Sequence, residues 1–317
     1  MHMHISGTNN PATLPLILAA PPFTALRDAA VAGRHAIVGG DCARGTVPPG
    51  FDRPSLRTLQ RGTELLNLGA RRLRLDQDNY FVANAGPDRS SVYEADAGAL
   101  VIVFASGALA QSRLAPDVEG TEAEPGGDAT GFLETLQPHG GAVTRHLRQI
   151  EGGLRAQLDD ALWWDERIVL LLDAAIDAET TLQRRAAALA ALRPATRREL
   201  LRRVLIASDH IQSHYDRPLA LHEIAAAAHL SAFHLVRLFR RVHGITPHAY
   251  LTRKRLQVAL RLLAGTRLGL DDIAARTGLG TRSSLFRHLR RQQGSGAAAL
   301  RARAAVSMEY DACSTFA

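Results

Sequence analysis

Arginines recur on one side of a short basic stretch, residues 232–241. Arg237, Arg240 and Arg241 lie there beside apolar residues that return every three or four positions. A guanidinium group is planar, always charged and rich in N–H donors, so it pairs with phosphate oxygens and with the acceptor edge of guanine. The chemistry that this stretch predicts is recognition of a polyanion by charge and hydrogen bonds.

Two short amphipathic helices must position these arginines. Apolar residues recur at helical spacing over residues 221–228, and the pattern restarts over residues 235–239 after a tight break. Ser231 is the expected N-cap of the second helix, and Gly244 marks its expected end. Two short helices separated by such a break predict a helix-turn-helix. The alternative is an ordinary helical hairpin with a merely solvated arginine face.

Charge divides the chain into an acidic and a basic part. Residues 1–195 contain 18 Arg, no Lys and 23 Asp plus Glu, a net charge of −5. Residues 196–317 contain 19 Arg, one Lys and eight Asp plus Glu, a net charge of +12. Such a split predicts two domains with different partners, the second one facing a polyanion.

The helix-turn-helix pattern occurs a second time. Residues 270–279 echo residues 221–230 at an offset of 49 residues, and residues 283–290 echo residues 232–240. A long helix is predicted between the two copies, over residues 247–263. Because coincidental hairpins would not repeat within one basic region, the duplication argues against the hairpin alternative.

The sequence resembles the AraC/XylS family of bacterial transcription regulators over about residues 199–301. The residues that carry the resemblance are Ile224-Ala225, Leu230-Ser231, His234-Leu235, Arg237, Phe239-Arg240, Gly244-Ile245-Thr246-Pro247, Tyr250-Leu251, Arg255-Leu256, Ala259, Leu262-Leu263, Ile273-Ala274 and Gly278-Leu279. The resemblance implies two helix-turn-helix units, joined by a long helix that presents both recognition helices to successive major grooves of double-stranded DNA.

Residues for DNA contact follow from this resemblance and from the outward helix faces. Expected base contacts are made by Phe233, Val236, Arg237, Arg282, Ser283, Phe286 and Arg287. Expected phosphate contacts are made by Arg240, Arg241, Arg290 and Arg291. The two histidines beside them, His234 and His288, are interpreted as packing residues rather than ligands. A purely solvated arginine face is the competing interpretation.

The sequence departs from the family pattern in three places, mostly in the second helix-turn-helix. Leu289 stands where the family usually has an aromatic residue, and Ser295-Gly296 is followed by Leu300-Arg301 where Ser-Pro and Tyr-Arg are usual. Ala220 and Gly269 occupy expected N-cap positions, which alanine fills poorly. We therefore expect the second unit to be less ordered without DNA.

The acidic half begins with β-type patterning. Short runs over residues 55–60, 64–68, 71–75 and 80–84 alternate partly and are separated by turn signals, which predicts a small barrel or sandwich. Residues 100–104 are continuously apolar, as in a strand buried on both faces. Helices are predicted from Gly141, with apolar residues at 143, 147, 150, 154 and 158, and over residues 165–178. The apolar pattern after residue 178 predicts that the second helix either continues or restarts before Pro194.

The predicted fold class is a two-domain α+β protein. The resemblance implies an N-terminal cupin-like β-barrel with following helices and a C-terminal all-α double helix-turn-helix. The expected divisions are an irregular arm over 1–40, a regulatory domain over 41–141, a helical dimerisation or cover region over 142–193, the DNA-binding domain over 194–304 and a tail over 305–317.

A small-molecule effector would need a pocket with apolar walls and a few polar groups. The β region offers Arg57, Gln60, Leu66, Arg71, Leu73, Tyr80, Tyr93 and Phe104. The same residues would fill the core of a plain barrel, so an N-terminal domain that only oligomerises or contacts a partner protein stays an alternative. Expected partners are double-stranded DNA, a second copy of the chain and, as further candidates, an effector and RNA polymerase.

Composition argues against other classes. No apolar run reaches the roughly 18–20 residues of a membrane span, and the two cysteines, Cys42 and Cys313, give neither a disulfide framework nor a metal motif. Histidines beyond the N-terminus up to residue 195 lack metal-ligand spacing, and no GxSxG, HExxH or phosphate-loop motif occurs. We expect a cytoplasmic protein without enzymatic activity, metal, cofactor or membrane partner.

Overall fold

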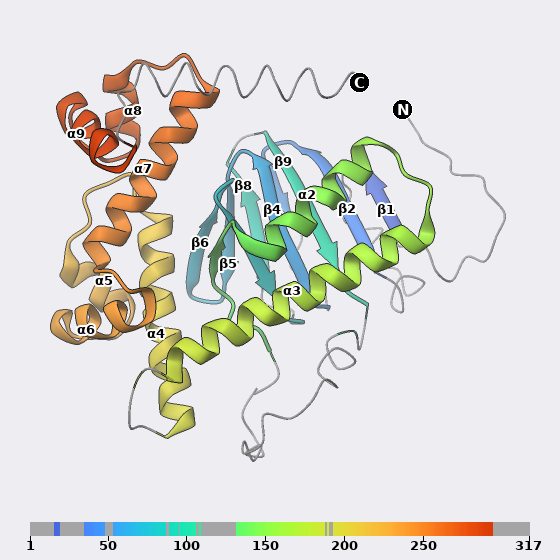
Figure 1. The fold of residues 1–317 in the computed structure, drawn as a ribbon, viewed down its shortest axis with the longest axis horizontal. Coiled ribbons are helices and arrows are strands. Elements are labelled where there is room, and N and C mark those ends of the chain that lie inside the picture. The colour runs from blue at the N-terminus through green and yellow to red at the C-terminus, as the bar shows by residue number, and fades with distance from the viewer. Residues whose placement is uncertain are drawn as a thin grey trace. The chain divides into compact units, whose positions relative to one another are not determined.

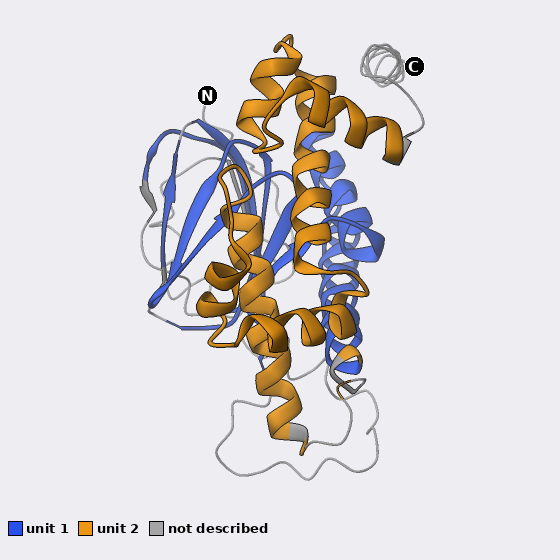
Figure 2. Cartoon of the chain, turned by 90° about the vertical axis from the view of Figure 1, so that its left-hand side faces the viewer, with its two compact units in different colours: residues 1–184 blue, residues 185–317 orange. Residues whose placement is uncertain are grey.

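The computed structural model divides the chain into two compact units, residues 1–184 and residues 185–317 (Figure 2). The structure describes residues 16–19, 35–47, 53–86, 89–94, 96–105, 108, 131–187, 189 and 193–293. Most of the expected arm over residues 1–40 and the whole expected tail over residues 305–317 lie outside these ranges.

Ten described strands form two sheets in the first unit (Figure 1). The six-stranded sheet has the order β1 (Leu16–Ala19), β2 (Ala36–Cys42), β9 (Ala97–Val103), β4 (Ser55–Arg61), β7 (Asn79–Ala83) and β10 (Leu136–Pro138). The four-stranded sheet has the order β3 (Gly45–Val47), β8 (Arg89–Tyr93), β5 (Glu64–Leu68) and β6 (Arg71–Leu75). All pairings are antiparallel except that of β1 with β2.

Within the described residues the two sheets do not close into a barrel, so the predicted cupin-like β-barrel is not confirmed. Two sheets packed over a shared core agree instead with the sandwich that the strand pattern also allows. The edges of the six-stranded sheet are β1 and β10, which do not pair with each other. The predicted irregular arm is wrong at residues 16–19, because β1 pairs in parallel with β2. Closing into a barrel removes the edges of a sheet, whereas packing against helices or another sheet buries its faces.

Strand β9 shows how the faces are covered. Val101 and Val103 point into a core shared with the four-stranded sheet, whereas Leu100 and Ile102 point into a second core with the helices. Because neighbouring residues of a strand face opposite sides, both sets are apolar and the whole strand is buried. This confirms the prediction of a strand buried on both faces.

Helices α2 (Gly141–Arg155) and α3 (Ala161–Ala187) pack on the outer face of the six-stranded sheet (Figure 1). Leu147 and Ile150 of α2 and Ile168 of α3 are fully or almost fully buried there. The predicted apolar seam is too long by one position, because Leu158 follows the end of α2 and is 40% exposed. Helix α3 begins before the predicted residue 165 and continues to Ala187, so the apolar pattern after residue 178 extends this helix and does not start another there.

The second unit consists of helices in its described part (Figure 1). They are α4 (Pro194–Ser213), α5 (Leu221–Ala227), α6 (Ala232–His243), α7 (Pro247–Gly265), α8 (Leu270–Arg276) and α9 (Arg282–Gln293). Helix α7 begins as predicted, since Thr246 Oγ1 accepts a hydrogen bond from the Ala249 N–H at 3.2 Å and Pro247 occupies the first turn. The pairs α5–α6 and α8–α9 sit at opposite ends of α7.

A histidine joins α6 to the helices around it. The Nε2 atom of His243 lies 2.7 Å from the Ser208 hydroxyl of α4, and the ring packs between Phe239 and Tyr250. Burial, with a smaller contribution from Arg185, lowers the pKa of His243 to about 4. The folded protein therefore holds this imidazole neutral where an unfolded chain would begin to protonate it.

This difference predicts a loss of stability in mild acid. Since the unfolded pKa is near 6.5 and the folded pKa is lower, stability is complete above about pH 6.5 and falls as the pH drops towards 4. Between pH 7.5 and 5, linkage gives a loss of about 2 kcal/mol from this residue. Denaturant unfolding followed by helical circular dichroism at the two pH values measures it.

The variant His243→Gln should remove most of this pH dependence, whereas His248→Gln, at an exposed histidine of α7, should leave it in place. An equal pH dependence in wild type and His243→Gln would contradict the assignment.

Candidate nucleic-acid interface

Helix α6 has a buried side and defined ends. Leu235, Leu238, Phe239 and Val242 are buried at helical spacing. The Ser231 hydroxyl accepts a hydrogen bond from the His234 N–H, which confirms the predicted N-cap. Gly244 ends the helix with a φ of 74°, in the left-handed region that glycine adopts without strain.

The opposite side of α6 carries the residues predicted to contact DNA. Phe233 is 81% exposed, which is unusual for a phenylalanine. Arg237, Arg240 and Arg241 are exposed, and Val236 is partly buried beside them. An exposed aromatic ring among guanidinium groups offers both apolar and hydrogen-bonding contacts to base edges.

Helix α9 is built in the same way. Thr281 Oγ1 accepts a hydrogen bond from the Ser284 N–H at 3.2 Å. Leu285 and Leu289 are buried against α7 and α8 residues such as Leu256 and Ile273. Leu289 is fully buried although the family usually has an aromatic residue there. The other departures, at residues 295–301, lie outside the described residues.

The outward side of α9 presents the second predicted set. Arg282, Ser283 and Arg287 are exposed, and Phe286 is 39% exposed. The Arg290 guanidinium lies 5.1 Å from the centre of the Phe286 ring, a cation–π contact, while Arg291 is exposed. The partly buried His234 and His288 flank the two outward faces.

The turn of the second helix-turn-helix is one residue longer than the turn of the first. Ile224 and Ile273 correspond at the predicted offset of 49, but the capping residues Ser231 and Thr281 are 50 apart. The echo of residues 232–240 therefore begins at Arg282, one position before the predicted start. The additional residue is Gly280, whose φ of 82° lies in the region that favours glycine.

A polar cluster that the sequence did not predict joins residues of α4, α5 and α7. Glu223, at the start of α5, pairs with Arg217 and lies 3.3 Å from His210 Nε2. The pairing with Arg217 and the bond from His210 hold the pKa of Glu223 at about 2, well below its usual range. Arg255 of α7 donates to backbone carbonyls of the same segment. The sequence feature that could have indicated this cluster is Arg255, a charged residue next to the apolar Leu256 on a helix that packs against others.

The eight residues predicted for an effector pocket do not line one space. Leu66, Leu73 and Tyr93 pack between the sheets, together with Arg57, whereas Tyr80 and Phe104 pack under the helices on the other side of the six-stranded sheet. Gln60 is exposed and binds Glu151, and Arg71 donates to the Glu134 carbonyl.

Arg57 takes part in a buried ion pair. Its Nη1 atom lies 3.0 Å from Glu64 Oε1, with side-chain exposures of 7% and 1%. Arg57 belongs to β4 and Glu64 to β5, so this ion pair links the two sheets. The predicted polar anchor of a ligand is used here within the protein.

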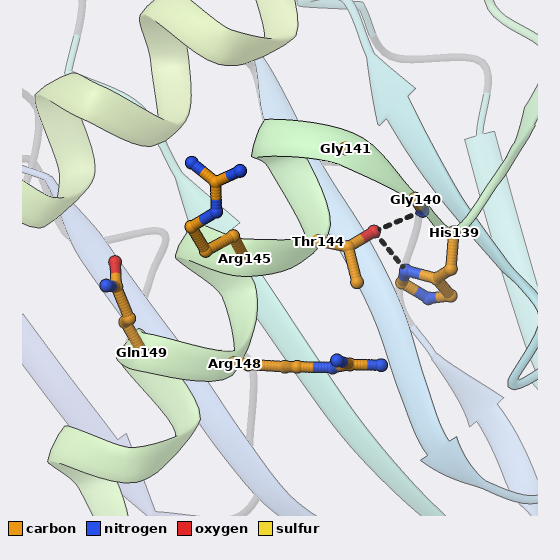
Figure 3. A pocket seen from close by; sticks show the side chains of 7 residues that line it. All are labelled: His139, Gly140, Gly141, Thr144, Arg145, Arg148 and Gln149. Carbon is orange, nitrogen blue, oxygen red and sulfur yellow. Dashed lines mark hydrogen bonds between the residues drawn. The ribbon is translucent and has the colours of Figure 1, made fainter.

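A different group of residues surrounds a surface hollow of about 500 Å³ at the start of α2 (Figure 3). Arg145, Arg148 and Gln149 line it together with His139. The Thr144 hydroxyl accepts a hydrogen bond from the Gly140 N–H at 2.6 Å and lies 3.1 Å from Nδ1 of the His139 ring (Figure 3). None of the eight predicted residues lines this hollow.

Within the described ranges, no group of three or more His, Cys, Asp or Glu side chains is arranged to hold a metal ion. Among the helices that the structure describes, none combines the length and apolar character needed to cross a bilayer.

Known proteins resemble the C-terminal part of the chain. Residues 224–303 match a family described as a helix-turn-helix domain. A probable transcriptional regulator, LumQ of Photobacterium leiognathi, is 34% identical over 96 residues, which cover 30% of this chain and 38% of that protein. The chain thus spans well under half the length of this curated relative.

Two solved structures each cover about a third of the chain. The DNA-binding domain of AdpA, in complex with a target DNA, is 31% identical over 32% of this chain and 90% of that chain, with a TM-score of 0.31. A probable AraC family transcriptional regulator from Rhodopseudomonas palustris CGA009 is 25% identical over 32% of this chain and 96% of that chain, with a TM-score of 0.30. The family match and the curated relative thus make the region of residues 224–303 similar to the helix-turn-helix domains of transcription regulators.

Proposed function

We propose that this protein is a cytoplasmic, sequence-specific regulator of transcription that inserts α6 and α9 into successive major grooves of double-stranded DNA. The observation that carries the proposal is the pair of similarly built helices, each capped and buried on one side and exposing arginine and phenylalanine on the other. Major grooves admit a helix, and successive grooves on one face are about 34–36 Å apart.

The exposed residues divide by the contacts that their position favours. Arg237 and Arg287 occupy the same place on their helices, in the second turn from the N-terminus, and a guanidinium there suits the O6 and N7 atoms of guanine. Phe233, Val236 and Phe286 suit thymine methyl groups, and Arg282 and Ser283 suit neighbouring base edges.

Four further arginines, Arg240, Arg241, Arg290 and Arg291, lie in the last turns and suit phosphates.

The readout assignment is tested with Arg237→Ala and Arg287→Ala. Each should weaken binding to a duplex selected from a random library by about 5- to 150-fold, the equivalent of about 1–3 kcal/mol, and relax base preference in one half of the site. Binding to unrelated duplex DNA should change much less. Fluorescence anisotropy at fixed salt measures both.

Arg240→Ala and Arg291→Ala are the matched controls, because each removes the same charge from the same helix. They should weaken binding to all sequences alike and reduce the slope of log K against log salt by about 1. A uniform loss for Arg237→Ala and Arg287→Ala as well would make these residues phosphate contacts and contradict the readout assignment.

We propose that the first unit forms a homodimer through the exposed side of α3. Leu162 is 78% exposed and Val169 is 47% exposed, seven residues apart, and the partly buried Ile176 continues the spacing. A seven-residue apolar repeat is typical of helices that pair along their length. We favour this role over effector binding, because the residues expected to line a pocket are used in packing.

The variant Leu162→Glu should convert the dimer into a monomer at micromolar concentration, since it places a charge in the apolar seam. Sedimentation velocity of the full chain measures the change. Thr181→Glu, which introduces the same residue at an exposed position of the same helix outside the seam, should leave the dimer intact. A monomeric wild type, or a dimer that survives Leu162→Glu, would rule out this interface.

A further inference from the structure

The two helix-turn-helix units meet beside the middle of α7, at the side chain of Arg255. Its Nε atom donates to the Tyr215 carbonyl at 2.7 Å, and its Nη2 atom donates to the Arg217 carbonyl at 2.7 Å. Both carbonyls belong to the segment between α4 and α5, which leads into the first helix-turn-helix (α5–α6). Arg255 therefore ties the connecting helix α7 to the segment that enters the first helix-turn-helix, by two charge-assisted hydrogen bonds.

The second helix-turn-helix approaches the same segment through the turn between α8 and α9. A Cβ atom on Gly278, between α8 and α9, would lie 2.8 Å from the Tyr215 carbonyl oxygen and 3.0 Å from both the Asp216 carbonyl oxygen and Arg255 Nη2. The 2.8 Å distance to a backbone oxygen is shorter than a Cβ atom allows, and the two 3.0 Å distances are tighter than usual, so a side chain at residue 278 would push the two segments apart.

Backbone conformation does not by itself explain this glycine. The corresponding position of the first turn is His229, which has a φ of 53°, close to the 68° of Gly278. A side chain is therefore compatible with this turn conformation when no neighbour approaches. At Gly278 the neighbour is the segment of residues 215–216.

Buried and charged groups hold that segment in place. The Lys254 ammonium lies 5.3 Å from the centre of the Tyr215 ring, and both residues are about 95% buried. The Arg217 side chain pairs with Glu223 of α5. A continuous set of contacts thus runs from α5 through Arg217 and Arg255 to the turn before α9.

We infer that Arg255 and Gly278 fix the orientation of the two helix-turn-helix units, α5–α6 and α8–α9, relative to each other. This orientation in turn sets the spacing of the two DNA half-sites. A single helix would allow the units at its ends to twist, whereas a lateral contact between the units opposes that motion. This inference rests on the proposed function. One inserted base pair moves a half-site by about 3.4 Å and roughly 35° around the duplex, which a fixed pair of helices does not follow.

The test compares binding to a selected DNA site with its spacer unchanged, shortened by one base pair or lengthened by one. For the wild type, either change should weaken binding roughly tenfold or more, because one helix loses its base contacts. For Arg255→Ala, the affinities for the three spacers should differ by less than about threefold, since the units can reorient. Arg255→Lys, which keeps one donor group, should restore part of the preference.

Two glycine variants test the close approach itself. Gly278→Asn should broaden or shift the spacer preference, because the side chain separates the turn from residues 215–216. Gly280→Asn is the matched control: its φ is also positive and no atom lies within 4 Å of its Cβ position, so it should keep the wild-type preference. Asparagine is used since it tolerates this backbone region.

Arg253→Ala serves as the charge control for Arg255, because it removes an exposed arginine two residues earlier. It should lower all three affinities by the same factor. Thermal unfolding of every variant shows that the comparison is made between folded proteins.

Folded Arg255→Ala and Gly278→Asn proteins that keep the wild-type spacer preference would overturn the inference while leaving the proposed function intact. A wild type that selects no duplex sequence at all would instead overturn the proposed function.

Discussion

Short helices need a partner to exist in water, and this constraint underlies the whole second unit. Helices α5 and α8 have seven residues each, well below the length at which an isolated helix is stable. Ile224 and Ala225, and their counterparts Ile273 and Ala274, are buried against neighbouring helices. The outward arginine faces of α6 and α9 are available because the opposite faces supply the apolar contacts that hold all six helices together.

Capping strengthens the same division of labour. The helices proposed to read DNA, α6 and α9, are capped by the hydroxyl groups of Ser231 and Thr281, whereas the supporting helices α5 and α8 begin without a side-chain cap. Stabilisation at the N-terminus is therefore placed on the helices whose first turns must keep a fixed geometry. The supporting helices depend on packing instead.

In the first unit the corresponding constraint is the two-sided burial of the six-stranded sheet. The helices cover one face and the four-stranded sheet covers the other, and the buried pair Arg57–Glu64 spans the second interface. Arg57, Gln60 and Arg71, which were candidates for binding a ligand, instead bond to Glu64, Glu151 and the Glu134 carbonyl of the same unit. What the unit leaves exposed is the apolar side of α3.

Local patterns in the sequence were sufficient for the helix-turn-helix units, their caps at Ser231 and Thr246, and the alternating strands, because each depends on neighbours within a few residues. Tertiary structure alone decided that the sheets stay open, that the expected pocket residues separate into two cores, and that Arg255 meets Tyr215 and Gly278. Arg255 is 40 positions from Tyr215 and 23 positions from Gly278, and the periodicity of a sequence carries no information about contacts between residues so far apart.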